Sequence, residues 1–317
     1  MEIIPNGEGS PADPWLAYFA DRGHRGVRRI GAGVEGVAYR LGEGRVAKVW
    51  SGRPSVGIEL IRRVYADIAR YPLPFFTPEI VGVEDHEGVL VTYERELPGV
   101  AMLPDSAHVD YERGLPIQHR GTLLAVLSGL ASVPGTQAMR QLTVRGDDRP
   151  LWRDHHRFQN ALAALVGRAA GRHCAALAAY VPDFEAGVRR VQKALHSLPD
   201  APVTAIHGDL VPPNIHIDAA GRPVAVLDFG FYTTAGDPAF EVAVTAAICD
   251  MYGPYAEEHT AELTKIFAHE LGYAPAILTT YQAAYALTTF DLFGLDDREG
   301  HFRWCAGQLR RNAVFNA

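Results

Sequence analysis

Two aspartates that each follow an apolar, strand-like segment carry the clearest chemical signal. Asp209 lies in residues 206–215, IHGDLVPPNI, and Asp228 lies in residues 226–230, VLDFG. Phosphoryl transfer needs an aspartate that orients and deprotonates an acceptor hydroxyl, an asparagine that binds Mg²⁺, and a second aspartate on the metal. Asp209, Asn214 five residues later and Asp228 nineteen residues later match this set in order and spacing.

A glycine pattern near the N-terminus indicates a loop that binds phosphates. Gly31, Gly33 and Gly36 form GxGxxG, which both dinucleotide-binding folds and kinases use to bring backbone amides to phosphates. A dinucleotide site requires a helix directly after the glycines. Residues 37–41 and 46–50 instead read as two strands around a turn. The kinase type of loop is therefore favoured over the dinucleotide type, and an ordinary glycine hairpin is the plainer alternative.

Lys48, in the second of these strands, is an unusual residue for this chain. Only three of the 30 basic residues are lysine. A compact ammonium suits the α and β phosphates of a nucleotide, although a solvated surface lysine is the alternative. Glu59, eleven residues later on a predicted helix, is the natural partner to hold Lys48. Its helical angle points away from the apolar stripe of that helix, so a solvated glutamate is the competing interpretation.

The order of predicted elements divides the chain into two parts. Residues 27–50 read as an antiparallel meander, 55–70 as a helix, and 81–84 with 89–93 as a hairpin. The turn at 97–99, LPG, ends this strand-rich part. Helical spacing then dominates 122–198 and everything from 238 onward, with short strands expected at 203–206, 216–217 and 224–227.

The motifs together resemble those of the aminoglycoside phosphotransferase and choline kinase superfamily. The resemblance rests on HGDLVPPN, LDFG and the later GDP at 236–238, and it runs from Gly31 to about Val244. Protein kinases share the fold but carry HRD and an activation segment that ends in APE, which this chain lacks. Two departures from the small-molecule family are Pro213, where glycine is frequent, and Glu241, where aspartate is common.

The resemblance implies an α+β, bilobal protein-kinase-like fold with a β-rich N-lobe over residues 1–96 and a mostly helical C-lobe over 97–317. The nucleotide, ATP or GTP, would lie under the glycine loop, with Lys48 and Glu59 anchoring its phosphates. Backbone groups from Glu94 to Glu96, in the hinge between the lobes, would hydrogen-bond the base.

By the same resemblance Asp209 is the catalytic base, and Asn214 and Asp228 hold Mg²⁺. His207 invites an interpretation as a general base, but a packing role with hydrogen bonds to the backbone is favoured. Asp237 would brace the catalytic loop.

By the same resemblance the acceptor would lie between Asp209 and the helices after residue 238. Residues 231–317 contain eleven acidic and five basic side chains. A cluster of carboxylates there would attract a cationic acceptor, whereas a solvated acidic surface is the plainer alternative. Asp291 and Asp296, with Tyr232, are the candidate acceptor-binding residues.

Composition narrows the function further. The net charge of −7 gives no basic field for nucleic acid, and no apolar run is long enough for a membrane helix. The three cysteines form no CxxC pair, so a protein without a disulfide framework is expected. We expect it in the cytoplasm, as a monomer or weak homodimer. The resemblance favours an antibiotic as the acceptor. A metabolic kinase for an amino alcohol, sugar or homoserine-like compound is the alternative, followed by a nucleotide-binding protein without catalysis.

Overall fold

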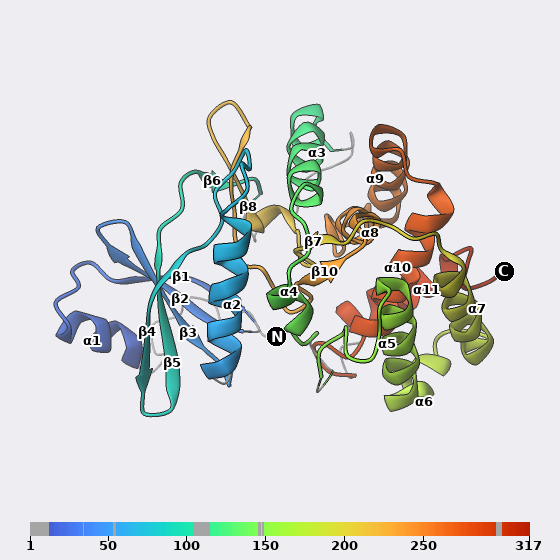
Figure 1. Ribbon diagram of the computed structural model, residues 1–317, viewed down its shortest axis with the longest axis horizontal. Helices are drawn as coiled ribbons and strands as arrows, with labels where there is room; N and C mark the ends of the chain where they lie inside the picture. The colour runs from blue at the N-terminus through green and yellow to red at the C-terminus, as the bar shows by residue number, and fades with distance from the viewer. Residues whose placement is uncertain are drawn as a thin grey trace.

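The computed structural model describes residues 13–33, 35–52, 55–103, 115–144, 147, 149–295 and 300–317. The chain forms two lobes side by side, strands with two helices in one and mostly helices in the other (Figure 1). This is the bilobal α+β fold that the sequence predicts.

A five-stranded antiparallel sheet forms the N-lobe, with the strand order β1-β2-β3-β5-β4. Its strands are β1 (Arg28–Gly33), β2 (Gly36–Gly42), β3 (Arg45–Trp50), β4 (Ile80–His86) and β5 (Val89–Arg95). Helix α1 (Pro14–Asp21) covers one face of the sheet, because Tyr18 and Phe19 pack in a core with Tyr39 and Val91. The predicted meander and hairpin are confirmed by this register.

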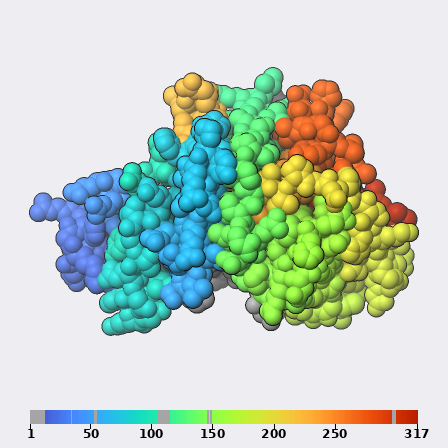
Figure 2. Space-filling model, in the orientation of Figure 1, coloured from blue at the N-terminus to red at the C-terminus, as the bar shows by residue number. Residues whose placement is uncertain are grey.

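Helix α2 (Ser55–Ile68) links the two lobes. Its apolar side buries Ile58, Ile61, Val64 and Tyr65, and these side chains belong to the same hydrophobic cluster as the C-lobe core. Figure 2 shows the light-blue surface of α2 against the green segment that contains α4 (Gln137–Gln141). Helix α2 is therefore packed against both the N-lobe sheet and the C-lobe. A division of the chain at residue 96 remains a prediction.

The C-lobe is built around helix α8 (Pro238–Ile248), in which every residue is buried. Helices α9 (Ala256–Leu271) and α10 (Pro275–Thr289) pack against it. The remaining C-lobe helices are α3 (Ile117–Ala131), α5 (Phe158–Arg172), α6 (Cys174–Ala178), α7 (Phe184–Ser197) and α11 (His301–Arg311). In the described ranges no helix combines the length and apolar character needed to cross a bilayer.

Two small sheets carry the loops that contain the predicted catalytic residues. Strand β7 (Thr204–Ile206) pairs with β10 (Thr234–Gly236), and β8 (Ile215–Ile217) lies between β6 (Val100–Ala101) and β9 (Pro223–Val226). A short 3₁₀ turn, η1 (Pro212–Asn214), connects the two sheets. The predicted strands at 203–206, 216–217 and 224–227 are confirmed, whereas β6, β10 and η1 are too short to produce a hydrophobic period in the sequence.

Candidate active site

Glu241 of helix α8 holds the loop that follows β7. Its Oε2 atom accepts hydrogen bonds from the backbone N–H groups of His207, at 2.7 Å, and Gly208, at 3.0 Å. Gly208 has a φ of +77°, and a Cβ atom there would lie 2.6 Å from the Cβ of Tyr232. Glycine is therefore required at this turn. Glu241, which stands where the family commonly has aspartate, is thus the acid that holds the predicted catalytic loop by hydrogen bonds.

Asp237 has a different position from the one predicted. It caps helix α8, where Oδ1 accepts the Ala239 N–H at 2.9 Å, while Oδ2 accepts the Tyr281 hydroxyl at 2.7 Å and the Gln159 amide at 3.2 Å. The prediction that Asp237 braces the catalytic loop is corrected by these contacts. The side chain one helical turn later, Glu241, has the reach to meet the loop.

His207 is fully buried and bonded to the backbone at both ring nitrogens. Nε2 donates to the Leu227 carbonyl at 2.8 Å, and Nδ1 accepts the Asp209 N–H at 3.2 Å. Burial lowers the pKa of His207 to about 4, so the ring is neutral and its proton lies on Nε2. The ring centroid lies 4.5 Å from that of Phe229. His207 thus connects the two aspartate segments without facing a substrate.

The Asp209 carboxyl lies in an environment that disfavours its charge. Burial, followed by the negative charges of Asp228 and Glu35, raises the pKa of Asp209 to about 7. Asn214 donates from Nδ2 to the Asp209 backbone carbonyl at 2.9 Å, which fixes the loop between them. A general base is most effective when its pKa lies near the working pH. The pKa of Asp209 is thus shifted in the direction that suits a general base.

Lys48 extends from β3 to the second aspartate. Its Nζ atom lies 2.6 Å from Oδ1 of Asp228 and 3.5 Å from Oε2 of Glu35, and 4.2 Å from the centre of the Trp50 ring. Burial opposes the ammonium, but the two carboxylates outweigh it and raise the pKa of Lys48. Asp228 has a φ of +50°, a sparsely populated conformation for a residue other than glycine.

The predicted pair between Lys48 and Glu59 is not formed in this structure. Glu59 accepts ion pairs from Arg62 at 3.0 Å and Arg63 at 3.3 Å, both on helix α2. The Lys48 ammonium forms ion pairs with Asp228 and Glu35 instead. The pair does not form because the buried side of α2 carries Ile58, Ile61 and Tyr65, and Glu59 lies on the outer side.

A cavity of about 420 Å³ opens between the glycine hairpin and the C-lobe. This volume lies in the usual range for small-molecule sites. Its walls contain apolar side chains that suit a flat base, including Ile30, Val46, Leu97 and Leu227. The predicted residues that line it are Gly31, Gly33, Gly36, Lys48, Glu94, Glu96, Asn214 and Asp228. Apart from Glu59, the structure therefore brings the predicted nucleotide and metal residues together, and Asp209 lies beside them.

In the hinge segment, Glu94 and Glu96 already form contacts within the N-lobe. The Glu96 N–H donates to the Gly44 carbonyl at 2.8 Å, and the Glu96 carboxylate pairs with Arg40. Glu94 accepts the Thr92 hydroxyl at 3.1 Å, and burial raises the pKa of Glu94. The Glu96 amide is thus engaged within the sheet, so a base would use other backbone groups of this segment.

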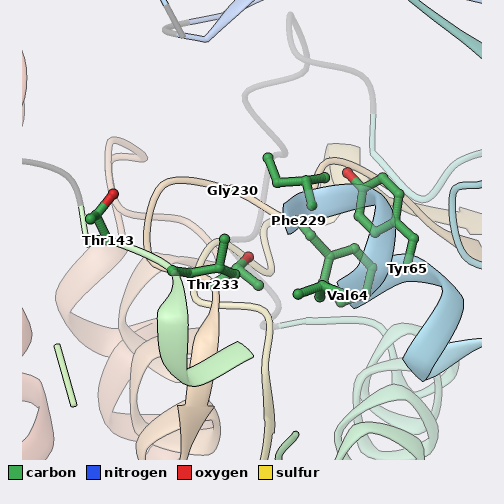
Figure 3. Close-up of a pocket in the computed structure, with 8 residues that line it drawn as sticks. Val64, Tyr65, Thr143, Phe229, Gly230 and Thr233 are labelled. Carbon is green, nitrogen blue, oxygen red and sulfur yellow. The ribbon is translucent and has the colours of Figure 1, made fainter. Parts of the chain in front are cut away.

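Helix α2 contacts the segment after Asp228 directly. Figure 3 shows Val64 and Tyr65 of α2 beside Phe229 and Gly230, around a small pocket that Thr143 and Thr233 also line. The Tyr65 and Phe229 rings meet edge to face with their centroids 5.8 Å apart. Sequence reasoning missed this contact, although the apolar stripe of α2 was its signal.

The predicted acceptor residues have three different outcomes. Tyr232 is wholly buried, and its hydroxyl bonds Thr288 at 2.9 Å, so the prediction that it binds the acceptor is wrong. Asp291 lies 4.0 Å from Arg172, which compensates its charge, and 3.7 Å from the His173 ring. Asp296 lies outside the described residues.

The oxygen atoms of Asn214 and Asp228 fit the magnesium role that the resemblance implies. Mg²⁺ prefers oxygen ligands and is commonly bound by one or two protein groups together with substrate phosphates. No group of three or more His, Cys, Asp or Glu side chains in the described ranges is arranged to hold a metal ion by itself. A magnesium ion at Asn214 and Asp228 would accordingly depend on nucleotide oxygens.

Comparisons with known proteins identify the family. The model of the phosphotransferase enzyme family, APH, matches residues 26–288, and the chain belongs to this family. A search of curated protein sequences finds no significant match.

Several solved structures share the fold. A thermostable mutant of aminoglycoside phosphotransferase APH(4)-Ia, solved with ADP and hygromycin B, is 18% identical with a TM-score of 0.67, covering 94% of this chain and 97% of that one. Macrolide 2'-phosphotransferase MphH from Brachybacterium faecium is 20% identical with a TM-score of 0.58, covering 94% and 98%. The gentamicin complex of APH(2")-IIa is 15% identical with a TM-score of 0.60, covering 96% and 98%. These likenesses show the fold.

Proposed function

We propose that this chain transfers the γ-phosphoryl group of ATP or GTP to a hydroxyl of a small molecule, with an antibiotic as the first candidate acceptor. The observation that carries the proposal is the meeting of Lys48, Asn214 and Asp228 at one cavity with Asp209 beside it. A cytoplasmic location and a monomer or weak homodimer belong to the same proposal.

Each group has a role that follows from its position. Lys48 would neutralise phosphate charge, and Asn214 and Asp228 would hold Mg²⁺, which supplies further positive charge to the phosphates. Asp209 would orient the acceptor hydroxyl and take its proton. His207 and Glu241 do not touch the reactants, since they hold the Asp209 backbone in place. Catalysis would then consist of positioning and charge neutralisation.

The antibiotic acceptor is supported by the solved relatives. They include complexes with hygromycin B and gentamicin and a macrolide 2'-phosphotransferase, and these antibiotics differ widely in charge and polarity. The compensation of the Asp291 charge by Arg172 weakens the specific case for a cationic acceptor. A macrolide-like acceptor therefore stands beside an aminoglycoside-like one within this proposal.

The test is a nucleotide-consumption screen of the purified protein. ATP and GTP are each supplied with Mg²⁺ and a panel of aminoglycosides, macrolides, peptide antibiotics, choline, homoserine and sugars. Acceptor-dependent release of ADP or GDP with an antibiotic supports the proposal, and the same result with a metabolite would favour the metabolic alternative. Nucleotide binding without turnover on any acceptor would favour a non-catalytic protein.

A further inference from the structure

An acidic residue lies inside the loop that is expected to receive phosphates. Glu35 stands between Gly33 and Gly36, at the turn between β1 and β2. Loops of this type bind anions through backbone N–H groups. A carboxylate in the same loop has the sign of charge of the phosphates themselves, and nothing in the glycine pattern requires it.

The Glu35 carboxylate faces the cavity and Lys48. Its Oε2 atom lies 3.5 Å from Nζ of Lys48, and the two side chains are only 11% and 16% exposed. Both line the 420 Å³ cavity together with Asp228. A charge pair with so little solvent around it is screened less than a surface pair.

Backbone contacts fix the position of Glu35. Its carbonyl accepts the Ser51 N–H at 2.9 Å, which ties the turn to the end of β3. Gly36 adopts a φ of +154°, and a Cβ atom there would lie 2.0 Å from the Val49 carbonyl oxygen, so only glycine allows this close approach. The side chain of Glu35 is thereby anchored next to the strand that carries Lys48.

Carboxylates surround the Lys48 ammonium at the phosphate site. Asp228 lies 2.6 Å and Glu35 3.5 Å from Nζ, and the charge of Glu94 also favours the ammonium. A nucleotide phosphate that pairs with Lys48 must displace one of them or share the ammonium with both. Asp228 has an alternative partner in Mg²⁺ under the proposed function. Glu35 is not a proposed magnesium ligand and lies in the phosphate loop itself, so it is the carboxylate placed to compete with the phosphates for Lys48.

We propose that Glu35 is a resident anion of the phosphate site, which occupies Lys48 in the empty enzyme and gives it up when a nucleotide binds. This inference rests on the proposed function, because it requires the cavity to be a nucleotide site. The apparent affinity of a ligand falls when the competent state of its site is only partly populated. Glu35 therefore weakens nucleotide binding and favours the release of the nucleotide product.

The experiment compares nucleotide affinity in variants that retain the size of the side chain. ADP and GDP are titrated by calorimetry, at fixed Mg²⁺, into wild type, Glu35→Gln and the control Glu87→Gln. Glu87 is an exposed acid in another hairpin turn of the same sheet, between β4 and β5, and does not line the cavity. Removal of a poorly screened charge next to the phosphates should tighten binding about tenfold in Glu35→Gln. Glu87→Gln should stay within about twofold of wild type.

A second pair of variants separates competition for Lys48 from general repulsion. If Glu35 acts through Lys48, then Glu35→Gln should change the dissociation constant by less than about twofold in a Lys48→Met background. An undiminished effect in that background, or unchanged affinity in Glu35→Gln alone, would overturn the inference while leaving the proposed function intact. Failure of wild type and all variants to bind either nucleotide would overturn the proposed function and this inference with it.

Discussion

Nζ of Lys48 lies 2.6 Å from Oδ1 of Asp228, and the two residues are 180 positions apart in the chain. Lys48 belongs to a strand of the N-lobe sheet, whereas Asp228 follows the small C-lobe strand β9. The contact therefore spans the two lobes at the cavity proposed to bind the nucleotide. It brings together two groups that the proposed phosphoryl transfer requires.

Replacing Lys48 should weaken nucleotide binding in a way that arginine does not repair. Charged hydrogen bonds contribute about 1.5 to 3 kcal/mol, so Lys48→Ala should raise the dissociation constant of ADP roughly 10- to 100-fold. A planar guanidinium does not reproduce a compact ammonium held between Asp228, Glu35 and the Trp50 ring. Calorimetric titration of Lys48→Ala and Lys48→Arg measures this directly. Full recovery by arginine would show that Lys48 acts only as a general surface cation.

Glu241 should matter to both the stability and the activity of the enzyme. Glu241→Ala leaves the buried N–H groups of His207 and Gly208 without their acceptor, at a cost of about 1 to 3 kcal/mol each. We expect a fall in melting temperature of several degrees and a larger loss of kcat than of nucleotide affinity. Glu241→Gln keeps an oxygen acceptor of the same reach and should retain most of both properties. Equal effects of Ala and Gln would mean that these two hydrogen bonds do not hold the loop.

The sequence supports correct predictions where a residue's role depends on local order, and fails where it depends on packing between elements. Asp209, Asn214 and Asp228 follow strands at a spacing that few other sites use, and their convergence was predicted. The Lys48 partner was misassigned because helix α2 directs Tyr65, and not Glu59, toward the C-lobe. The helical angle of Glu59, opposite the apolar stripe, was the local signal for this outcome, but the pattern alone does not show what the apolar face packs against.

Packing between elements also decides which acid holds the loop after β7 and which residues could contact the acceptor. Asp237 caps helix α8 and Glu241 lies in its first turn, and only the register of the helix against β7 decides which of them reaches His207. Tyr232 follows the catalytic segments closely in sequence, yet its ring packs against Phe240 and Tyr285 in the core. Proximity in the chain to a functional motif did not imply exposure to the substrate.

The raised pKa of Asp209 predicts a specific dependence of stability on pH. Its pKa is about 7 in the folded protein, and an aspartate in an unfolded chain has a pKa of about 3.9. The folded state thus binds a proton that the unfolded state has lost, so this group's contribution to the free energy of unfolding falls as pH rises through this interval. Asp209→Asn removes this pH-dependent contribution. The free energy of unfolding of the variant, relative to that of wild type, should therefore increase as pH rises from 5 to 8.

Urea denaturation at pH 5, 6.5 and 8 provides the measurement. Asp218→Asn is the control, because hydrogen bonds from Arg222 lower the pKa of Asp218 and leave it ionised in both states above pH 5. The difference between Asp218→Asn and wild type should be constant over this range. A constant difference for Asp209→Asn as well would contradict the raised pKa.

Asp291 should act as a structural ion-pair residue. Its carboxylate is 18% exposed and lies near Arg172 and His173, in helix α5 and directly after it. Asp291→Asn should lower the melting temperature slightly, since the partly buried Arg172 is left uncompensated. The acceptor KM should change by less than about twofold. A steep rise in acceptor KM, together with a KM of the wild type that rises with ionic strength, would instead restore the acceptor-binding role.

The central claim is that Asp209 serves as the base for phosphoryl transfer from a nucleotide bound at Lys48 and Asp228. The most direct test incubates wild type and Asp209→Ala with Mg²⁺, nucleotide and an acceptor found in the screen, and follows phosphorylated acceptor by mass spectrometry while calorimetry gives the ADP dissociation constant. Loss of a positioned base should lower turnover by about 10² to 10⁴ and leave the ADP dissociation constant within about threefold. Turnover of Asp209→Ala at the wild-type rate would contradict the account.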